Sequence, residues 1–384
     1  MNKTLAIDLD FIKKEFSHLE SLYFNTAYFG PTPFSGKAKI EAALAREINP
    51  SFYPYSEWKA IPETIREKLA TLLHCPADNI CHSTSVGDIN SLVANGFNFA
   101  SGDRVAAIDK DYPSNILPWM VAQKNSLLTF DLLKLEEESL PTVEWLARKL
   151  SPKTRIFCIS YVTFETGKKI DLLSIGKFLK DRNILFCVDA TQALGGMAIS
   201  KEQLSYIDVL SCASYKWMLG PYGHAFAYFS DRALAQIRQT TGNWIVSPNS
   251  KEAHNLLDYT IETLPGARKY DRGQTPNMLL MSCLESSLDL LNKLGLKNIE
   301  AYNTSLRDHF MEIYPKNKYF LNAPLENLGN ILSLKAKSID AIELENNLKD
   351  KNIDVSVRQG NVRLSFHLFN TVEQVNILAS AMDL

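Results

Sequence analysis

The sequence predicts an α/β protein in which a large domain, built on a mainly parallel sheet between helices, is joined to a smaller α+β domain. Two patterns and the chain length predict this fold class. Between residues 102 and 230, short and continuously apolar runs alternate with segments of helical periodicity. After about residue 266 the alternation stops, and separate strand-like runs follow a long apolar helix. Because 384 residues are too many for one small core, we expect residues 20–266 to form the large domain and residues 267–384, with 1–19, the small one.

The first element that the pattern predicts is a helix over residues 57–73, because Ile61, Ile65, Leu69 and Leu72 then lie on one face. Five later runs are expected to be strands of the sheet. Each is apolar throughout, which is typical of strands that helices cover on both sides. The runs are residues 105–108, 156–162, 184–188, 209–213 and 225–229.

Further helices are expected between these strands and after them. Residues 172–179 carry Leu172, Ile175 and Leu179 at helical spacing. Residues 278–294 form a longer apolar segment of the same kind, which leads into the predicted small domain. That domain is expected to contain strands over 331–334, 353–357 and 362–366 and a helical tail.

The charge of the chain is balanced, with 41 Lys and Arg against 43 Asp and Glu and a net charge of −2. Such a surface would not attract a polyanion, so we expect neither nucleic acid nor a membrane surface as a partner. No stretch approaches the roughly 18 apolar residues of a membrane helix, and charge interrupts the N-terminus too early for a secretory signal. The six cysteines form no C-x-x-C pair. These features predict a cytoplasmic protein.

Polar residues gather where the predicted strands end. In a doubly wound sheet, ligands bind beyond the carboxyl ends of the strands. Four polar segments follow strands, and a fifth precedes a helix start; they are residues 111–115, 163–167, 189–192, 214–217 and 83–87. If these loops converge, one site holds an aromatic ring, a carboxylate, an amide, a lysine and a helix N-terminus. That set suits a charged aromatic cofactor with a phosphate, and the chemistry indicates pyridoxal 5′-phosphate (PLP).

Each residue type has a reason to be at a PLP site. A lysine such as Lys216 can hold the aldehyde as a Schiff base and then move protons at the substrate α-carbon. A carboxylate such as Asp189 facing the pyridine nitrogen keeps that nitrogen protonated, which makes the ring an electron sink. Backbone N–H groups at a helix start suit a phosphate, and an aromatic ring stacked on the cofactor fixes its plane.

Taken one at a time, these residues also fit ordinary structural roles. Asp189 could cap the next helix, and Lys216 alone would be an ordinary solvated lysine. Ser85 could be a helix cap only, and Tyr112 beside Pro113 could pack in a turn. The joint occurrence of the residues in this order is what favours a cofactor site.

Competing motifs are absent from the sequence. It contains no G-x-x-x-x-G-K-[ST] phosphate loop, no G-x-G-x-x-G between a strand and a helix and no G-x-S-x-G nucleophile elbow. The seven histidines include no H-E-x-x-H or other compact ligand cluster, so no metal site is predicted.

Together these segments resemble the class V aminotransferase family of fold-type I PLP enzymes, which includes cysteine desulfurases, kynureninase and isopenicillin-N-epimerase-like proteins. One matching segment is Ser214-Tyr215-Lys216-Trp217-Met218-Leu219-Gly220-Pro221, which is specific only together with the others. The other matching segments keep the family order from residue 23 to residue 370; they are residues 23–27, 30–33, 83–90, 111–119, 188–192, 273–277 and 362–370. The resemblance implies a fold-type I PLP-transferase fold.

The resemblance also implies a role for each matching residue toward the cofactor. Lys216 would carry the Schiff base, and Asp189 would pair with the pyridine nitrogen. Gln192 would donate to the ring oxygen, and Tyr112 would take the stacking position that often holds histidine. The remaining cofactor residues would lie near the phosphate, one of them reaching the partner subunit of a homodimer with shared active sites; they are Thr84, Ser85, Val86, Ser214, Tyr215 and, across the dimer, Thr275.

For the substrate, the resemblance implies that Arg363 binds an amino-acid carboxylate with its guanidinium fork. Asn25 and Ala27 would lie in the N-terminal loop that lines the substrate pocket. The alternative for Arg363 is a solvent-facing strand residue, which its alternation with Val362 and Leu364 allows.

Three departures from the family pattern bear on the reaction. Between Ile353 and Arg363 the chain is short, whereas cysteine desulfurases carry their persulfide-forming cysteine on a longer loop there, and no cysteine follows Cys283. Phe164 stands where desulfurases commonly have asparagine, and Tyr112 replaces the common histidine. These changes favour the epimerase-like branch, which contains epimerases, lyases and transaminases.

We therefore expect a PLP-dependent enzyme that acts at the α-carbon of an amino acid, as an aminotransferase or an epimerase. Two alternatives remain open. One is β-elimination from a cysteine-like substrate, as in a C–S lyase or a desulfurase. The other is a PLP-binding protein without turnover.

Overall fold

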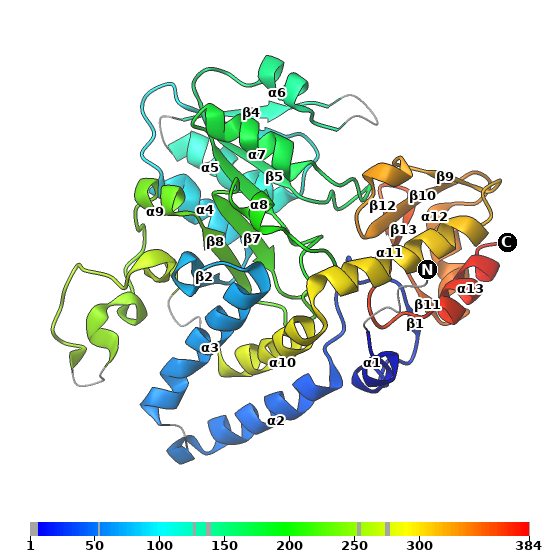
Figure 1. Ribbon diagram of the computed structural model, residues 1–384, viewed down its shortest axis with the longest axis horizontal. Helices are drawn as coiled ribbons and strands as arrows, with labels where there is room; N and C mark the ends of the chain where they lie inside the picture. Colours follow the sequence, from blue (N-terminus) through cyan, green and yellow to red (C-terminus); the bar gives the residue numbers. More distant parts are fainter. Residues whose placement is uncertain are drawn as a thin grey trace.

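The computed structural model describes residues 7–52, 54–125, 128–135, 140–251, 255–272 and 277–383. Figure 1 shows a large sheet with its helices beside a smaller sheet near the C-terminus, and α10 and α11 run from the first toward the second. Within the described part of the chain, no helix combines the length and apolar content needed to cross a bilayer.

Seven strands form the large sheet, and all but one of them are parallel. β8 runs antiparallel to β2 and to β7, whereas the pairs from β7 to β4 are parallel. In spatial order the strands are β2 (Ile80–Ser83), β8 (Ala225–Phe229), β7 (Val209–Ala213), β6 (Leu185–Asp189), β5 (Thr154–Ser160), β3 (Arg104–Ile108) and β4 (Thr129–Leu133). The prediction of a mainly parallel sheet is confirmed.

The apolar strands of this sheet bury side chains on both faces. Along β5, Phe157 and Ile159 belong to one apolar core, and Ile156 and Cys158 belong to another. Successive side chains of a strand point to opposite faces, so helices must cover both. The helices that accompany this part of the chain are α3 (Tyr55–Leu73), α4 (Val86–Gly96), α5 (Leu117–Asn125), α6 (Val143–Lys149), α7 (Leu172–Asp181), α8 (Lys201–Leu204) and α9 (Asp231–Gln236).

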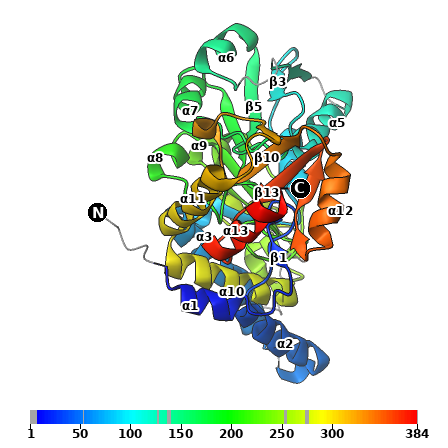
Figure 2. The ribbon, with the colours of Figure 1, turned by 90° about the vertical axis from the view of Figure 1, so that its right-hand side faces the viewer.

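A four-stranded antiparallel sheet forms the smaller part, in the order β12 (Ser356–Arg358), β13 (Asn361–Ser365), β10 (Ile331–Ala336) and β9 (Tyr319–Leu321). Its two faces differ. Leu332, Leu334, Val362 and Leu364 are fully buried on one face, and the other carries serines and Arg363. Figure 2 shows this sheet with its helices beside it, α11 (Leu296–Ile313), α12 (Ala341–Lys349) and α13 (Val372–Ala381).

The N-terminal segment lies against both parts. β1 (Leu22–Tyr23) pairs in parallel with β11 (Ile353–Asp354), and α1 (Leu9–Glu15) contacts α2 (Phe34–Ile48). α10 (Met278–Leu294) packs against α2 and α3. The division at residues 266 and 267 stays a prediction.

Several predicted boundaries were wrong in part. Residues 353–357 are two short strands rather than one, because Asp354 pairs with β1 whereas Ser356 pairs with β13. The strand predicted to reach residue 162 ends at Ser160, and Val162 instead forms a bridge with Lys169. Neither β2 nor β4 was predicted; β2 is short, and the exposed or half-buried residues of β4 lack a continuous apolar run.

Candidate active site

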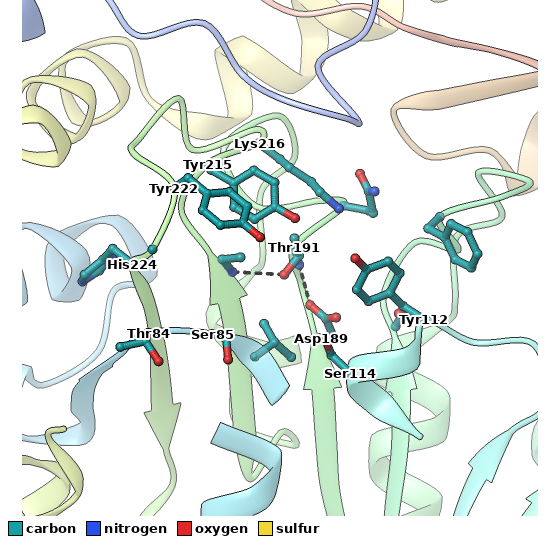
Figure 3. A pocket seen from close by; sticks show the side chains of 16 residues that line it. Thr84, Ser85, Tyr112, Ser114, Asp189, Thr191, Tyr215, Lys216, Tyr222 and His224 are labelled. Atoms are coloured by element: carbon teal, nitrogen blue, oxygen red, sulfur yellow. Dashed lines mark hydrogen bonds between the residues drawn. The ribbon is translucent and has the colours of Figure 1, made fainter. Parts of the chain in front are cut away.

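The polar loops at the carboxyl edge of the large sheet converge on one pocket, as the sequence predicted. All five predicted loops contribute side chains to its lining. Figure 3 shows Lys216, Asp189 and Tyr112 pointing toward a common space. The pocket is lined by Thr84, Ser85, Val86, Tyr112, Ser114, Ser160, Phe164, Asp189, Thr191, Gln192, Ala213, Tyr215, Lys216, Tyr222, Gly223 and His224.

Lys216 follows β7 and extends its side chain into this pocket (Figure 3). Only 5% of the residue is exposed, so the solvated-lysine alternative is wrong. Its Nζ lies 5.2 Å from the ring centroid of Tyr112 and 5.5 Å from that of Tyr215. The pKa of Lys216 is lowered to about 8, chiefly by burial; Asp189 acts against this lowering, and the positive charges of Arg363 and Arg358 add to it.

Contacts from distant parts of the chain hold the lysine loop in place. Gly30 N–H donates to the Tyr215 carbonyl at 2.8 Å, and a Cβ on Gly30 would come within 1.9 Å of the Lys216 carbonyl oxygen. This close approach requires glycine. His367 Nε2–H donates to the Trp217 carbonyl at 2.9 Å, and the Ser287 hydroxyl donates to the Leu219 carbonyl at 2.6 Å. The lysine is therefore positioned by a loop with little freedom to move.

The lowered pKa predicts how the protein would react with the aldehyde of PLP. An aldehyde reacts with the uncharged amine, and near pH 8 about half of Lys216 is uncharged, against less than about 1% of an ordinary lysine. The rate of covalent PLP capture, followed by absorbance, should rise with pH and level off above about pH 8 to 9. A rate that kept rising to pH 10 would contradict the lowered pKa.

Asp189 ends β6 and points into the pocket beside Thr191 (Figure 3). Its Oδ1 accepts from Thr191 N–H at 2.9 Å, and Asn115 Nδ2 approaches Oδ2 at 3.5 Å. Burial raises the pKa of Asp189, against the lowering effect of the Thr191 hydrogen bonds and of Lys216. A cation beside this carboxylate would offset the cost of burying it, which is what a protonated pyridine ring supplies.

The N-terminus of α4 forms another wall of the pocket. Ser85 is the N-cap, since its hydroxyl accepts from Asp88 N–H at 3.1 Å, and Thr84, Ser85 and Val86 all line the cavity. The helix-cap role of Ser85 is therefore correct, and it is compatible with a phosphate site. The first N–H groups of a helix of 11 residues have no intrahelical acceptor and carry partial positive charge, which suits a phosphate.

A buried chain of two histidines leads from α3 to the lysine loop. His82 Nε2 lies 2.8 Å from the Pro62 carbonyl, so it must be the donor. Burial lowers the pKa of His82 to about 3 and lowers that of His224 too, so both rings are neutral. His82 Nδ1 then accepts from His224 Nε2 at 3.3 Å, and His224 Nδ1 accepts from the Ser214 hydroxyl at 2.7 Å. Ser214 is fully buried behind the pocket wall, and its predicted contact with the cofactor stays a prediction.

Gln192 lines the pocket, but two of its hydrogen-bonding groups are used by the protein. Its Oε1 accepts from Trp217 Nε1 at 3.0 Å, and its Nε2 donates to the Ala27 carbonyl at 3.0 Å. One amide hydrogen remains for a ligand. Through Gln192 the predicted Ala27 is tied to the wall of the site. The Ala27 N–H also donates to the Ser365 hydroxyl at 3.0 Å, which fixes this residue to the end of β13.

Arg363 reaches the same region from the small sheet. It is 2% exposed, so the solvent-facing alternative is wrong. Its Nη1 donates to the carbonyl of Phe164, a pocket residue, at 2.8 Å, and its Nε donates to the Ser356 hydroxyl at 3.2 Å. Its Nη2 has no hydrogen-bond partner among the described residues. Burial and the charge of Arg358 lower the pKa of Arg363 to about 9, so the site favours an anion beside it.

Two other predicted residues remain to be placed. Asn25 donates from Nδ2 to the Val355 carbonyl at 3.1 Å, and its Oδ1 is buried without a partner among the described residues. Thr275 lies outside the described residues, so its predicted contact with the phosphate of a partner subunit stays a prediction.

Several pocket residues were not among the predicted site residues. Thr191 follows a predicted strand, so its position at the sheet edge was available as a signal; Ser160 ends β5, but the predicted strand continued to residue 162. No such sequence signal identified Tyr222, Gly223 and His224 as pocket residues. They come before β8, and they line the pocket only because β8 runs antiparallel to its neighbours.

The residues present fit PLP as a bound group. An amine with a lowered pKa, a buried carboxylate and a helix N-terminus surround one cavity, with the Tyr112 ring beside the amine. Next to this cavity, the Nη2 hydrogens of Arg363 lack an acceptor among the described residues. Lys216, Asp189 and the start of α4 would hold the cofactor.

Comparisons with known proteins agree with this geometry. The family model described as aminotransferase class-V matches residues 53–378. A probable cysteine desulfurase of Methanothermobacter thermautotrophicus is 23% identical over 338 residues, which cover 83% of this chain and 82% of that protein. Isopenicillin N epimerase of Streptomyces clavuligerus is 24% identical over 374 residues, which cover 94% and 93%.

Solved structures share the fold. Two structures of a protein called C-DES each align with a TM-score of 0.86 at 18% identity. One, a mutant with glycine covalently linked to the PLP cofactor, covers 97% of this chain and 99% of its own. The other, described as the cystine C–S lyase C-DES with its reaction product cysteine persulfide, covers 95% and 98%. The fold-type I prediction is confirmed.

Proposed function

Because the chain belongs to the class-V aminotransferase family, whose cofactor is PLP, we propose that it acts at the α-carbon of an amino acid as an aminotransferase or an epimerase. One observation carries this proposal. Lys216 and Arg363 come from different sheets to one site, and the Nη2 group of the guanidinium has no partner there among the described residues. An amino acid supplies an amine, which would take the place of Lys216 on the cofactor aldehyde, and a carboxylate, which Arg363 would bind.

The roles follow from the chemistry of each side chain. When bound, PLP condenses with amines through its aldehyde, and its protonated ring withdraws electrons from the substrate α-carbon. Asp189 holds that ring nitrogen in its protonated form, and the start of α4 binds the phosphate. Arg363 binds the substrate carboxylate and so orients the α-hydrogen toward Lys216.

Lys216 then moves a proton as general base and acid. Its Nζ removes the α-hydrogen. Transamination follows if the proton is delivered to C4′ of the cofactor, and epimerisation follows if a proton returns to the opposite face of the α-carbon. For the second outcome an acid is needed on the far face, and Tyr112, 5.2 Å from Nζ by its ring centroid, is our candidate.

A second candidate function is β-elimination from a cysteine-like substrate. The likeness to C-DES, described as a cystine C–S lyase, favours it. Desulfuration through a protein persulfide is less well supported, because no cysteine is among the described residues that line the pocket. Burial also raises the pKa of Cys81, Cys158 and Cys212, which makes these thiols poor nucleophiles.

The test is a spectral titration of the purified holoenzyme with D- and L-amino acids, with and without a 2-oxo acid acceptor. Transamination should require the acceptor, epimerisation should give the other enantiomer without it, and elimination should release pyruvate and ammonia. A protein that shows no spectral change with any amino acid would contradict the proposed function and favour a PLP-binding protein without turnover.

Replacing Arg363 with Ala should raise the KM for amino acids by at least about thirtyfold, because truncating a charged hydrogen-bond partner costs about 2 kcal/mol or more. Arg363→Lys should recover part of this loss, since lysine keeps the charge and loses the fork. The thermal stability of the apoprotein should not fall, because the substitution removes a buried and incompletely paired charge. An unchanged KM would remove the carboxylate role.

We also propose a cytoplasmic homodimer with shared active sites. All six cysteines are free thiols, which supports a reducing compartment. Apolar side chains near the site are exposed, among them Tyr222 at 68% and Tyr28 at 57%, and a partner subunit would cover them. Sedimentation should give twice the mass of 43.3 kDa, and a monomer with full activity would contradict shared sites.

A further inference from the structure

A hairpin turn places a second arginine, Arg358, close to Arg363. Gln359 and Gly360 form the turn between β12 and β13, with φ of 49° and 76°. Two central residues with positive φ are typical of a type I′ turn, which matches the twist of the strands it joins. Arg358 and Asn361 are the pair that closes this hairpin. The turn therefore fixes the position of Arg358 relative to β13.

The register of the two strands puts both arginines on one face of the sheet. Ser356 lies opposite Arg363, and Arg358 comes two residues after Ser356. Residues two apart on a strand point to the same face. Diagonal neighbours of this kind are about 7–8 Å apart. This is the face from which Arg363 donates to Phe164 at the pocket wall.

The positive charge of Arg358 is not paired with a carboxylate of the described residues, so it is available to a ligand. Within the described part of the chain the guanidinium forms no ion pair; its Nη1 donates to the Val357 carbonyl at 2.7 Å, and its Cζ lies 5.7 Å from the ring centroid of Tyr28. The residue is half-buried. Its positive charge lowers the pKa of both Lys216 and Arg363, so its field reaches the reacting amine and the carboxylate site.

The site has more positively charged than negatively charged side chains. Among the described residues that line the pocket, Asp189 is the one carboxylate, and it faces the cofactor position from the end of β6. The positive groups near this carboxylate are Lys216 in the pocket and Arg363 and Arg358 on the small sheet, whose charges act on Lys216. After Arg363 has bound an α-carboxylate, Arg358 still lacks an anion, and an isolated guanidinium at a partly desolvated site favours one.

We infer that Arg358 binds a carboxylate on the substrate side chain, so that the enzyme acts on α-amino dicarboxylates. The inference rests on the proposed function, because Arg363 must hold the α-carboxylate. L-aspartate and L-glutamate carry their carboxylates two and three carbon atoms apart. Two guanidinium groups on neighbouring strands can bind both ends of such a molecule, while its amine points toward Lys216.

The test compares acidic and neutral amino acids of the same shape on the holoenzyme. Dissociation constants from spectral titration should be at least about tenfold lower for L-aspartate or L-glutamate than for L-asparagine or L-glutamine, since a hydrogen bond between two charged groups is stronger than one to a neutral amide. In Arg358→Gln this ratio should fall to about one, with the neutral amino acids bound as before. Arg358→Lys should keep part of the preference.

Two further variants keep the outcomes apart. Lys351→Gln removes one exposed positive charge from the segment before β11 and should leave the ratio unchanged. Arg363→Lys should weaken acidic and neutral amino acids alike. If the wild type binds both classes equally, or if Arg358→Gln weakens both by the same factor, the inference is overturned while the proposed function stands. No spectral response to any of these amino acids would overturn both.

Discussion

Replacing Lys216 with Ala is expected to lower turnover by at least about a thousandfold, the largest effect of any single substitution in this chain. Two losses combine, because the same amine attaches the cofactor and moves the α-proton. Proton transfer by a positioned side chain alone is worth about a hundred- to ten-thousandfold. The measurements are kcat with the best substrate of the amino-acid panel, and cofactor retention after borohydride reduction and denaturation.

Two control variants distinguish the loss of the reactive amine from the loss of a positive charge and from a general effect on folding. Lys216→Arg keeps a positive charge beside Asp189 and the Tyr112 ring but cannot form the covalent link, so it should be as inactive as the alanine variant. Lys201→Ala, which removes an exposed lysine at the start of α8, should retain full turnover. If the alanine variant kept normal turnover and a reducible link, Lys216 would not be the catalytic residue.

Replacing Asp189 with Asn is expected to lower kcat by about a hundred- to a thousandfold, the range found when one preorganised electrostatic partner is removed. Asparagine has the same size and can still accept from Thr191 N–H. It lacks the charge that would keep the pyridine nitrogen protonated, so the cofactor would withdraw electrons less strongly from the α-carbon. Kinetics and the absorption spectrum of the bound cofactor measure the two effects together.

Asp111 offers a matched comparison for Asp189. It is also a buried carboxylate at the sheet edge, and burial raises its pKa too, but it does not line the pocket and instead accepts from the backbone and side chain of Ser160. Asp111→Asn should therefore lower thermal stability more than kcat. An equal loss of kcat in both variants would mean that Asp189 acts through local structure rather than by its charge.

The sequence predicted the strands of the large sheet that are buried on both faces, because continuous apolar runs mark them. The strand over 209–213 and the helix over 278–294 have the predicted bounds. It did not predict β4, which is half-buried and includes Asp131, or the break after Asp354. Those elements depend on which partner strand is available, and local pattern carries no such information.

The candidate site divides in the same way. Lys216, Asp189, Tyr112 and the start of α4 could be predicted, since each follows an apolar strand or begins a helix, and parallel strands end at one edge. The N–H group of Arg363 that lacks a partner among the described residues could not be predicted. The position of the guanidinium depends on its hydrogen bond to Phe164, 199 residues away in sequence, and this bond forms only when the small sheet packs beside the large one.

By itself, then, the sequence determined the fold class, the edge of the sheet at which the pocket lies and the lysine and carboxylate that line it. The physical reason lies in short stretches of the chain. A strand that is buried on both faces must be apolar throughout, and the residues that follow parallel strands must lie at the carboxyl edge of the sheet. The tertiary structure alone decided which groups surround that lysine. It placed the segment before β8 in the pocket wall, linked His82 to Ser214 through His224 and set Arg358 beside Arg363. Hydrogen bonds and charge fields between segments far apart in sequence form only after both sheets are packed, so no pattern along the chain records them.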